Sequence, residues 1–308
     1  MHLLRYATAA GANRVGVRDD DGVLRPLTDH ATMADLLTLT RDQLREAVTR
    51  PGGLGEPEDP DTVALLPPLD GRGEVWCAGV TYERSRGARA EESVEASVYD
   101  RVYAAERPEL FPKSPAWRVV TDDEPIGIRE DSGHDVPEPE LALVVNRHGE
   151  IVGLGICDDV SSRSIEGENP IYIPQAKIFS GGCAVAAAVR PAWEVSDLHD
   201  LTITIDVSRD GTTVFGGSTS TSHLARRLED LVSYLCRAHD FPDGVVLATG
   251  TGIVPELDFA LLAGDVVTID IEHVGQLRNT VRVGREAFEC LAETPQTRPT
   301  LGFLQEAR

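Results

Sequence analysis

Long apolar runs, signal-peptide features and paired cysteines are all missing from this 308-residue chain. No stretch approaches the ~20 apolar residues that a membrane-spanning helix needs, and residues 1–6 lack the basic start and apolar core of a secretory leader. The cysteines are scattered, without a Cys-x-x-Cys pair: Cys77, Cys157, Cys183, Cys236 and Cys290. Such an odd set indicates reduced, mostly buried thiols, so we expect a cytoplasmic protein.

Basic charge is also scarce. The 29 basic residues are outnumbered by 51 acidic residues, which gives a formal net charge of −22. This balance argues against nucleic acid or an anionic membrane surface as a partner, because both would be repelled. The same excess indicates a salty cytoplasm, although an acidic surface also serves solubility alone.

Lysine is the scarcest basic residue. Lys113 and Lys177 are the two lysines, so arginine supplies the other 27 of the 29 basic residues. Arginine is effectively always protonated, whereas a buried lysine can shift its pKa and exchange a proton. Both lysines are therefore candidates for acid–base chemistry, with chance survival as the alternative.

What the chain does contain is an ordinary globular composition, with 41% hydrophobic and 26% charged residues. A chain of 308 residues is long enough for one large domain or two modest ones. Residues 1–27 alternate as short strands do. Residues 33–49 have apolar side chains at three-four spacing behind Thr32, which predicts one helix with Thr32 as its N-cap.

A linker rich in proline and glycine follows at residues 51–61. We therefore predict a small N-terminal domain over residues 1–62 and a catalytic domain over residues 63–308. No Gly-x-Gly-x-x-Gly follows a predicted strand and no Walker loop is present, so nucleotide binding has no support.

The larger part is rich in predicted strands. They cover residues 74–80, 138–146, 150–157, 201–208, 245–249 and 265–272. Helices are predicted over 93–106 and 222–237, and the polar segment 81–92 has the composition of a mobile lid. Two long helices among many strands predict an α+β fold with a dominant β-sandwich or barrel.

Three carboxylates are predicted to converge at one end of a hairpin. Side chains alternate along a strand, so Glu138 and Glu140 point to one face, roughly 7 Å apart. A two-residue turn at His148-Gly149 would join this strand to the next, and the resulting register pairs Glu138 with Asp159. Opposed Cβ atoms lie about 4.5–5.5 Å apart.

Carboxylates this close repel one another unless protons or a hard divalent cation lie between them. Oxygen ligation without histidine or cysteine suits Mg²⁺, Mn²⁺ or Ca²⁺ rather than Zn²⁺. The alternative is a solvent-facing edge strand with acidic side chains, which is common in so acidic a chain.

Motifs across residues 74–285 resemble, in the same order, those of the fumarylacetoacetate hydrolase superfamily. They are Glu138-Pro-Glu140-Leu-Ala-Leu-Val-Val, Asp159-Val-Ser-Ser-Arg163, Gln175-Ala-Lys177, Thr249-Gly-Thr251 and Gly264-Asp-Val-Val-Thr-Ile-Asp-Ile271. The resemblance implies that Glu138, Glu140 and Asp159 hold one Mg²⁺. It also implies a mixed β-sandwich roll that assembles as a homodimer or homotetramer.

One family feature is absent. Superfamily hydrolases that cleave C–C bonds in diketo acids carry a His-x-x-Glu pair that activates water. Ser85 and Ala88 stand at those positions here, and neither side chain can serve as a titratable base. This departure weakens the hydrolase interpretation.

A subgroup of the superfamily, the 2-keto-3-deoxy-D-arabinonate dehydratases, is more similar. The shared stretches are Val75-Trp76-Cys-Ala-Gly79-Val-Thr-Tyr82-Glu83, Arg107-Pro-Glu109-Leu-Phe111-Pro-Lys113 and Glu166-Gly-Glu168-Asn169-Pro170-Ile-Tyr172-Ile-Pro174-Gln175-Ala-Lys177. The resemblance implies dehydration of a 2-keto-3-deoxy pentonate to 2,5-dioxopentanoate in oxidative pentose degradation, with Glu109 and Lys177 as the acid–base pair. Ser164 replaces the usual aspartate and Pro112 a bulky residue, departures that bear on pocket shape.

The implied chemistry suits these residue types. A 2-keto acid chelates a metal through its carboxylate and C2 carbonyl, and the cation stabilises an enolate-like intermediate. Beside a divalent cation, Lys177 would lose its proton more readily and act as base, and Glu109 would protonate the departing hydroxyl. Which of the two starts the reaction stays open.

Further residues in these motifs are predicted to contact the substrate: Tyr82, Lys113, Arg163, Gln175 and Thr251. Alternatives stand beside several of them. Arg163 could pair with a metal ligand, Thr251 could be a turn residue, and Lys113 could lie in an exposed loop. Glu109 could be a solvated carboxylate at a helix end.

Three functions therefore compete. The leading hypothesis is a Mg²⁺-dependent dehydratase of a small 2-keto-3-deoxy sugar acid. The second is a diketo acid C–C hydrolase or acylpyruvase of the same superfamily. The third is a non-catalytic metal-binding protein whose acidic cluster is structural.

Overall fold

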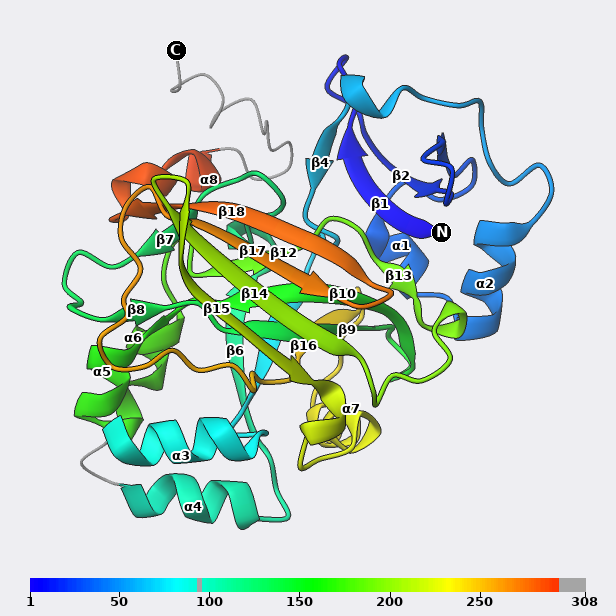
Figure 1. The fold of residues 1–308 in the computed structure, drawn as a ribbon. Coiled ribbons are helices and arrows are strands. Elements are labelled where there is room, and N and C mark those ends of the chain that lie inside the picture. Colours follow the sequence, from blue (N-terminus) through cyan, green and yellow to red (C-terminus); the bar gives the residue numbers. More distant parts are fainter. Residues whose placement is uncertain (93–95, 294–308) are drawn as a thin grey trace.

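The computed structural model describes residues 1–92 and 96–293, in which two β-sheets pack face to face (Figure 1). The larger sheet contains, in spatial order, β12 (Cys183–Val185), β10 (Ile151–Asp159), β9 (Pro139–Val145), β16 (Val245–Ala248), β5 (Glu74–Gly79) and β6 (Glu109–Pro115), with β13 (Arg190–Pro191) paired to β10. The smaller sheet contains β15 (Thr212–Ser220), β14 (Thr202–Arg209), β17 (Val266–Ile271), β18 (Gly275–Val283) and β7 (Ile126–Ile128). The predicted α+β sandwich is confirmed.

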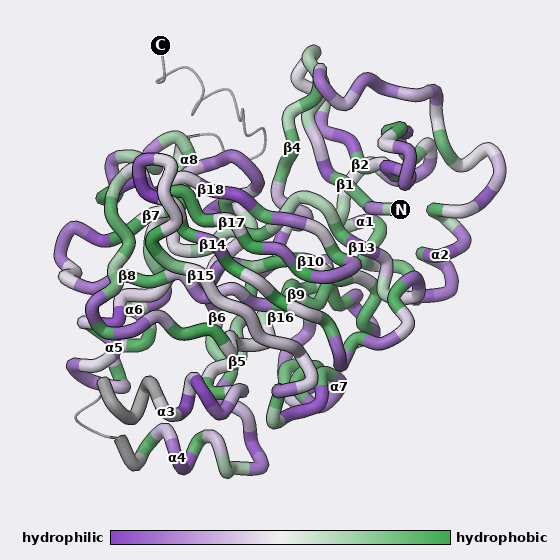
Figure 2. The backbone as a smooth tube through the Cα atoms, viewed as in Figure 1, coloured by the Kyte–Doolittle hydropathy of each residue, from purple (hydrophilic) through white to green (hydrophobic). Residues whose placement is uncertain are grey.

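Both faces of the larger sheet are buried, which explains the apolar sequence of its central strands. Along β9, Leu141 and Leu143 join the core between the two sheets, whereas Ala142 and Val144 belong to a second core on the opposite face. Hydrophobic residues predominate along these central strands, whereas the outlying helix α2 (Arg41–Thr49) is largely hydrophilic (Figure 2). The alternation places Glu140 on the second face, away from the smaller sheet.

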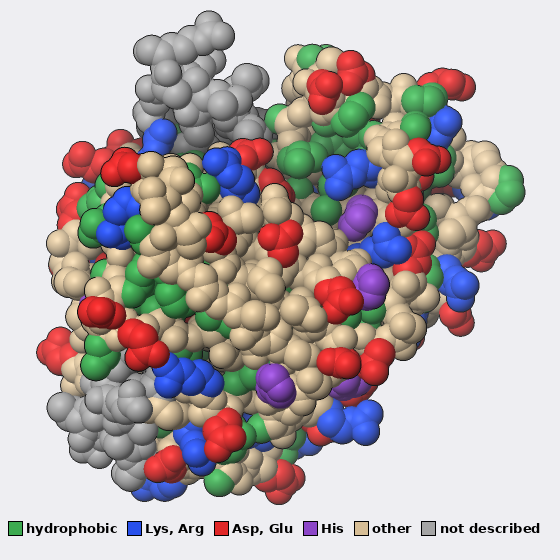
Figure 3. Space-filling view, viewed as in Figure 1, with side chains coloured by type: hydrophobic (Ala, Val, Ile, Leu, Met, Phe, Trp, Pro, Cys, Tyr) green, Lys and Arg blue, Asp and Glu red, His purple; other side chains and the backbone are tan. Residues whose placement is uncertain are grey.

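The larger sheet curls strongly. β6 and β10 stand far apart in the strand order, yet the Lys113 Nζ of β6 lies 2.9 Å from the carbonyl oxygen of Val160, just after β10. The second face is therefore concave. By contrast, the outward face of the smaller sheet shows mostly backbone and side chains that are neither charged nor hydrophobic (Figure 3).

The N-terminal residues pack beside the larger sheet rather than over the smaller one (Figure 1). They form a third sheet, β3 (Leu24–Pro26), β2 (Asn13–Arg18), β1 (His2–Ala7) and β4 (Ala64–Leu66), and the helices α1 (Met33–Leu37) and α2 (Arg41–Thr49). Met33, Leu36 and Leu44 join the core on the concave side of the larger sheet. The division into residues 1–62 and 63–308 stays a prediction.

The prediction of one helix over residues 33–49 is wrong in one respect: residues 38–40 interrupt it, so it forms the two helices α1 and α2. Thr32 caps α1 as predicted. Thr40 then adopts an extended conformation and caps α2, and Gln43 completes a capping box. A threonine hydroxyl that satisfies backbone N–H groups favours a new helix start over continuation.

Other helical segments differ from the prediction. The segment 81–92, predicted from its composition as a mobile lid, contains α3 (Glu83–Glu92), and the helix predicted over 93–106 corresponds to α4 (Ala96–Ala104), with 93–95 outside the described residues. The helix predicted over 222–237 is shorter, α7 (Leu228–Leu235), because the chain before it is extended: the Ala225 N–H donates to the Thr81 carbonyl at 2.9 Å, and Arg227 has ψ 144° at the N-cap. Motion of the 81–92 segment stays a prediction.

The remaining elements are short. They are β8 (Asp135–Val136), β11 (Ser161–Ser162), α5 (Arg163–Glu168), α6 (Ile173–Lys177) and α8 (Cys290–Glu293), with 3₁₀ turns at Pro60–Thr62, Ala116–Arg118, Pro170–Tyr172, Ala192–Glu194, Thr221–His223 and Glu286–Phe288. Among the residues described, no helix has the length and apolar character required to span a membrane.

The β9–β10 hairpin has the predicted register but not the predicted turn. The N–H of Asn146 bonds the carbonyl of Glu150 at 3.1 Å, which closes a three-residue loop with Gly149 at φ 75°. A register shift after Ile151 compensates for the extra loop residue. The strands therefore still bring Asp159 opposite Glu138, with 3.0 Å between the Asp159 nitrogen and the Glu138 carbonyl oxygen.

Integration of the N-terminal helices with the larger sheet is testable, because the three tryptophans lie outside residues 1–62. Replacing the fully buried Leu36 with alanine should lower the free energy of unfolding by about 2–5 kcal/mol. Tryptophan fluorescence and circular dichroism should shift together in urea. Leu257→Ala, at a 64% exposed site, is the control. An unchanged fluorescence midpoint in Leu36→Ala would show that the N-terminal part unfolds alone.

Candidate active site

Three buried carboxylates meet on the concave face of the larger sheet. Glu138 immediately precedes β9, Glu140 lies within it, and Asp159 ends β10. One ligand oxygen from each lies within 4.8 Å of the others. Each residue is at most 4% exposed, so the interpretation as a solvent-facing acidic edge is wrong.

A backbone N–H orients one of these carboxylates. The N–H of Gly250, which follows β16, donates to Glu140 Oε2 at 2.7 Å. Gly250 has φ 89°, and a Cβ there would lie 2.0 Å from the hydroxyl of Thr81, so only glycine fits. The N–H of Glu138 donates to Asp158 Oδ1 at 2.9 Å, which links the start of β9 to the end of β10. These two bonds hold together the strands that carry the cluster.

Three basic side chains contact the cluster. Lys177 Nζ lies 2.8 Å from Glu138 Oε2 and 3.1 Å from Asp159 Oδ2. Arg163 Nη1 lies 3.5 Å from Glu138 Oε1, and Lys113 Nζ lies 2.5 Å from Asp159 Oδ1. Burial has the largest single effect and lowers the pKa of Lys113, but the Asp159 carboxylate and the buried thiols of Cys77 and Cys183 together outweigh it, so the pKa is raised and the ammonium stays charged.

The electrostatics of the cluster fit a hard cation. Burial, followed by the charges of Asp159 and Glu138, holds the pKa of Glu140 well above its ordinary value, although Lys177 and the Gly250 N–H oppose the shift. A positive ion among these oxygens would remove that repulsion. Carboxylate donors without nitrogen or sulfur suit Mg²⁺ or a similar cation.

The carboxylates open into a cleft. It is lined by Ala78, Gly79, Val80, Ser85, Glu109, Phe111, Glu138, Glu140, Asp159, Glu166, Ile173, Lys177, Gly250 and Thr251. Glu109 lies opposite Gly79 in the β5–β6 pair, and a Cβ on Gly79 would lie 2.2 Å from Glu109 Oε2. The missing side chain therefore makes room for the Glu109 carboxyl. Glu109 and Lys177, predicted as an acid–base pair, line one cleft.

The residues predicted to bind substrate lie at different distances from the cleft surface: Thr251 lines it, whereas Tyr82, Gln175 and Lys113 do not. Thr251 lines the cleft, but its hydroxyl exchanges hydrogen bonds with Ile253 in a turn, which favours the turn alternative. The Tyr82 side chain is buried behind the lining, and burial raises its pKa. Gln175 is exposed on α6. Lys113 is buried outside the cleft lining, so the exposed-loop alternative is wrong.

Sequence reasoning assigned no role to Glu166, Ser161 or Gly250. Glu166 is a 3% exposed carboxylate on the cleft wall, and the Ser161 hydroxyl accepts a hydrogen bond from Lys177 Nζ. Glu166 and Gly250 stand inside motifs that carried the family resemblance, so position within those motifs was the available signal. Ser161 likewise stands inside the Asp159-Val-Ser-Ser-Arg163 motif.

The β8–β11 pair supports the cleft from outside. The N–H of Arg163 donates to the carbonyl of His134 at 2.7 Å, which fixes the start of α5. The hydroxyl of Ser164 lies 2.9 Å from that of Ser132, so this departure from the family pattern is absorbed in a serine network rather than in the cleft. Burial raises the pKa of the neighbouring Asp135 to about 6.

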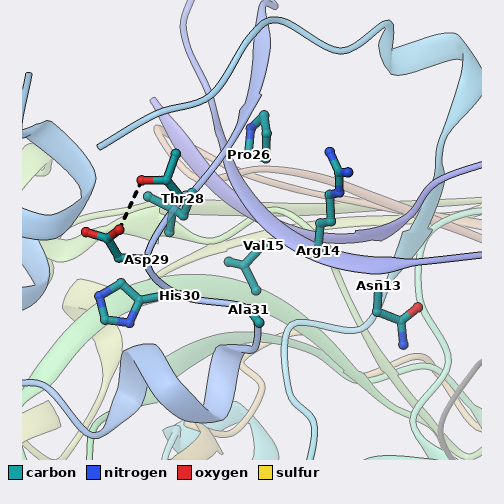
Figure 4. Close-up of a pocket in the computed structure, with 9 residues that line it drawn as sticks. Asn13, Arg14, Val15, Pro26, Thr28, Asp29, His30 and Ala31 are labelled. Carbon is teal, nitrogen blue, oxygen red and sulfur yellow. Dashed lines mark hydrogen bonds between the residues drawn. The ribbon is translucent and has the colours of Figure 1, made fainter. Parts of the chain in front are cut away.

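A second depression lies on the N-terminal sheet, between β2, β3 and the approach to α1 (Figure 4). Its charged groups are engaged with the protein. Arg14 pairs with Glu58 and Asp29 pairs with Arg50, while Asp29 also accepts a hydrogen bond from Thr28. No group of side chains converges there as the carboxylates do in the cleft.

Comparison with known proteins agrees with this geometry. Residues 74–282 match the model of the fumarylacetoacetate (FAA) hydrolase C-terminal family. A probable 2-keto-3-deoxyxylonate dehydratase from Haloferax volcanii is 42% identical over 91% of this chain and 99% of its own length. A 2-dehydro-3-deoxy-D-arabinonate dehydratase from Saccharolobus solfataricus is 40% identical over 73% of this chain and 76% of its own.

A solved structure is also similar across nearly the whole chain. It is a 2-keto-3-deoxy-D-arabinonate dehydratase complexed with magnesium and 2,5-dioxopentanoate. It matches with a TM-score of 0.79 and 33% identity over 92% of this chain and 100% of that one. The fold of this chain is thus shared with that of a solved dehydratase. The chain belongs to the fumarylacetoacetate hydrolase family.

The raised pKa of Asp135 predicts a pH-dependent stability. A carboxyl whose pKa rises from 3.8 to about 6 on folding is best tolerated when protonated, so its destabilising effect is absent below pH 4 and complete above pH 6. Asp135→Asn should therefore be more stable than the wild type at pH 8. Urea unfolding at pH 4, 6 and 8 measures the difference. A difference that is constant across this range would contradict the assignment.

Proposed function

We propose that the protein is a Mg²⁺-dependent dehydratase that converts a 2-keto-3-deoxy sugar acid of the arabinonate or xylonate type to 2,5-dioxopentanoate and water. One observation carries the proposal: the buried cluster of Glu138, Glu140 and Asp159 opens into the same cleft as Lys177 and Glu109. The names of similar full-length relatives support the same reaction.

Glu138, Glu140 and Asp159 would hold the Mg²⁺. When bound, the ion supplies Lewis acidity toward the carboxylate and the C2 carbonyl of a 2-keto acid and favours enolate character at C3. The carboxylates have already converged, with Glu140 held by the Gly250 N–H and Glu138 and Asp159 by Lys177, so ligand geometry does not have to be created at the moment of binding.

Lys177 and Glu109 would move the protons. Dehydration removes a proton from C3 and a hydroxyl from C4, and tautomerisation then gives the C5 aldehyde. One side chain must accept the carbon-bound proton and the other must protonate the hydroxyl as it leaves. Lys177 is fixed at the end of α6, and Glu109 faces the cleft from β6, so the two approach a bound substrate from different elements.

The other residues predicted to contact the substrate are proposed for different roles. Thr251 borders the cleft, while Arg163 contacts Glu138, in keeping with the alternative in which it stabilises a metal ligand. Tyr82 would act through packing behind the cleft. Gln175 lies on the exposed side of α6 and would reach substrate only from there.

The hydrolase alternative is weaker because Ser85 and Ala88 replace the His-x-x-Glu pair that activates water in superfamily hydrolases. The Ser85 hydroxyl donates to the carbonyl of Tyr82 at 3.0 Å within the first turn of α3, and a serine so placed does not activate water. The non-catalytic alternative does not explain why the buried Lys177 and the carboxyl of Glu109 line the same cleft as the proposed metal ligands.

We further propose a cytoplasmic homodimer or homotetramer in which residues 1–62 support the catalytic part, 63–308. All five cysteines are free, which agrees with a reducing compartment. Light scattering on the purified protein measures the assembly.

The activity is directly testable. Purified protein with Mg²⁺ should convert 2-keto-3-deoxy-D-arabinonate to 2,5-dioxopentanoate, detected by coupling to 2-ketoglutarate semialdehyde dehydrogenase. EDTA should abolish turnover and added Mg²⁺ should restore it, because the carboxylates alone offer no Lewis acid. Pyruvate release from an acylpyruvate, without product from the sugar acid, would favour the hydrolase instead.

Two variants separate metal binding from proton transfer. Glu140→Gln should lose both Mg²⁺ binding and turnover. Lys177→Met should lose about 10²–10⁴ in kcat without weakening Mg²⁺ binding, because it removes a competing cation from Glu138 and Asp159. The exposed Asp240→Asn is the control. Full turnover in Lys177→Met would rule out Lys177 as a catalytic residue.

A further inference from the structure

Lys113 occupies an unusual position in its strand. Val75 pairs with Ser114 and Trp76 pairs with Pro112, so Lys113 is the extra residue of a β-bulge on β6. A bulge re-aims the side chain that it carries. Pro112 fits there because β6 is the edge strand of the larger sheet, where a missing N–H is tolerated. The bulge turns Lys113 inward, and it is 1% exposed.

The ammonium of Lys113 is fully committed to the protein. Its Nζ donates to the carbonyl oxygens of Val160 at 2.9 Å and Lys177 at 2.6 Å, and it lies 2.5 Å from Asp159 Oδ1. It also sits 5.4 Å from the centre of the Phe179 ring. A lysine has three donors, as many as the oxygens contacted here, and Lys113 itself does not line the cleft.

The three oxygen partners belong to the machinery of the cleft. Asp159 is a metal-ligand candidate, Val160 is its neighbour, and Lys177 ends α6, where carbonyl groups lack intrahelical donors. Lys113 also shares strand β6 with Glu109. Lys113 therefore connects three elements: β6, which carries the proposed acid Glu109; β10, which ends at the metal-ligand candidate Asp159; and α6, which ends at the proposed base Lys177.

We propose that Lys113 is a positioning residue for the dehydratase and does not bind the substrate. It holds Asp159 Oδ1, which leaves Oδ2 to face the cleft, and it anchors the end of α6 so that Lys177 keeps its place beside the ligands. This inference rests on the proposed function for its kinetic readout, but the metal-binding readout is independent of it.

The test uses Lys113→Met, which removes the ammonium and keeps the length of the side chain. Arg209→Met is the matched control, because Arg209 likewise binds a buried carboxylate, Asp265, and a carbonyl, but in the smaller sheet. Mn²⁺ affinity is measured calorimetrically without substrate, and kcat and KM are measured on the sugar acid.

Lys113→Met should weaken Mn²⁺ binding and lower kcat by about 10- to 100-fold each, the range for residues that orient metal ligands. The KM should change by less than about threefold, because no donor of Lys113 reaches the substrate. Arg209→Met should leave Mn²⁺ affinity and kcat at wild-type values. Unchanged Mn²⁺ affinity with a raised KM would overturn the proposal and make Lys113 a substrate ligand.

Lys113→Arg covers the case in which the methionine variant does not fold. It keeps the charge, but a planar guanidinium cannot aim donors at three oxygens arranged around an ammonium. We expect weaker Mn²⁺ binding than in the wild type, and wild-type affinity would overturn the positioning role. If wild-type protein yields no 2,5-dioxopentanoate, the proposed function fails, while the Mn²⁺ titrations still decide the role of Lys113.

Discussion

Mutual repulsion among three buried carboxylates is the constraint on which the rest of the structure depends. One oxygen each of Glu138, Glu140 and Asp159 lies within 4.8 Å of the others, and all three side chains are buried. Unpaired buried charges are strongly destabilising. The fold surrounds them with cations and a backbone N–H, and both lysines of the chain lie at this point. A chain that otherwise uses arginine thus keeps its two compact ammonium groups for one cluster.

The same constraint links fold to function. Because β9 is buried on both faces, alternation separates apolar residues that join the two sheets from carboxylates that face the concave side. The curl of the larger sheet then brings β6, with Glu109 and Lys113, across to the end of β10. The proposed metal ligands thus come from β9 and β10, the proposed acid from β6 and the proposed base from α6, and the core fixes the positions of the strands.

Much of this could be predicted from the sequence, and the failures have physical causes. Strand periodicity located β9, β10, β14, β16 and β17, and the hairpin register placed Glu138 opposite Asp159. The hairpin loop was misjudged because a bulge after Ile151 restores the register that a two-residue turn would have set. The helix over 33–49 was misjudged because Thr40 caps a new helix, and capping competes with periodicity. The start of α7 was misjudged because Ala225 pairs with the distant Thr81 backbone. The Lys113 side chain points inward because of a β-bulge in β6, and the local sequence does not predict that bulge.

The most direct test of the central claim is a crystal structure of the protein soaked in Mn²⁺, with anomalous diffraction used to locate the ion. The account predicts a single strong peak coordinated by oxygens of Glu138, Glu140 and Asp159, with Lys113 still in contact with Asp159. A peak at another place, or well-ordered carboxylates with no peak between them at saturating Mn²⁺, would contradict it.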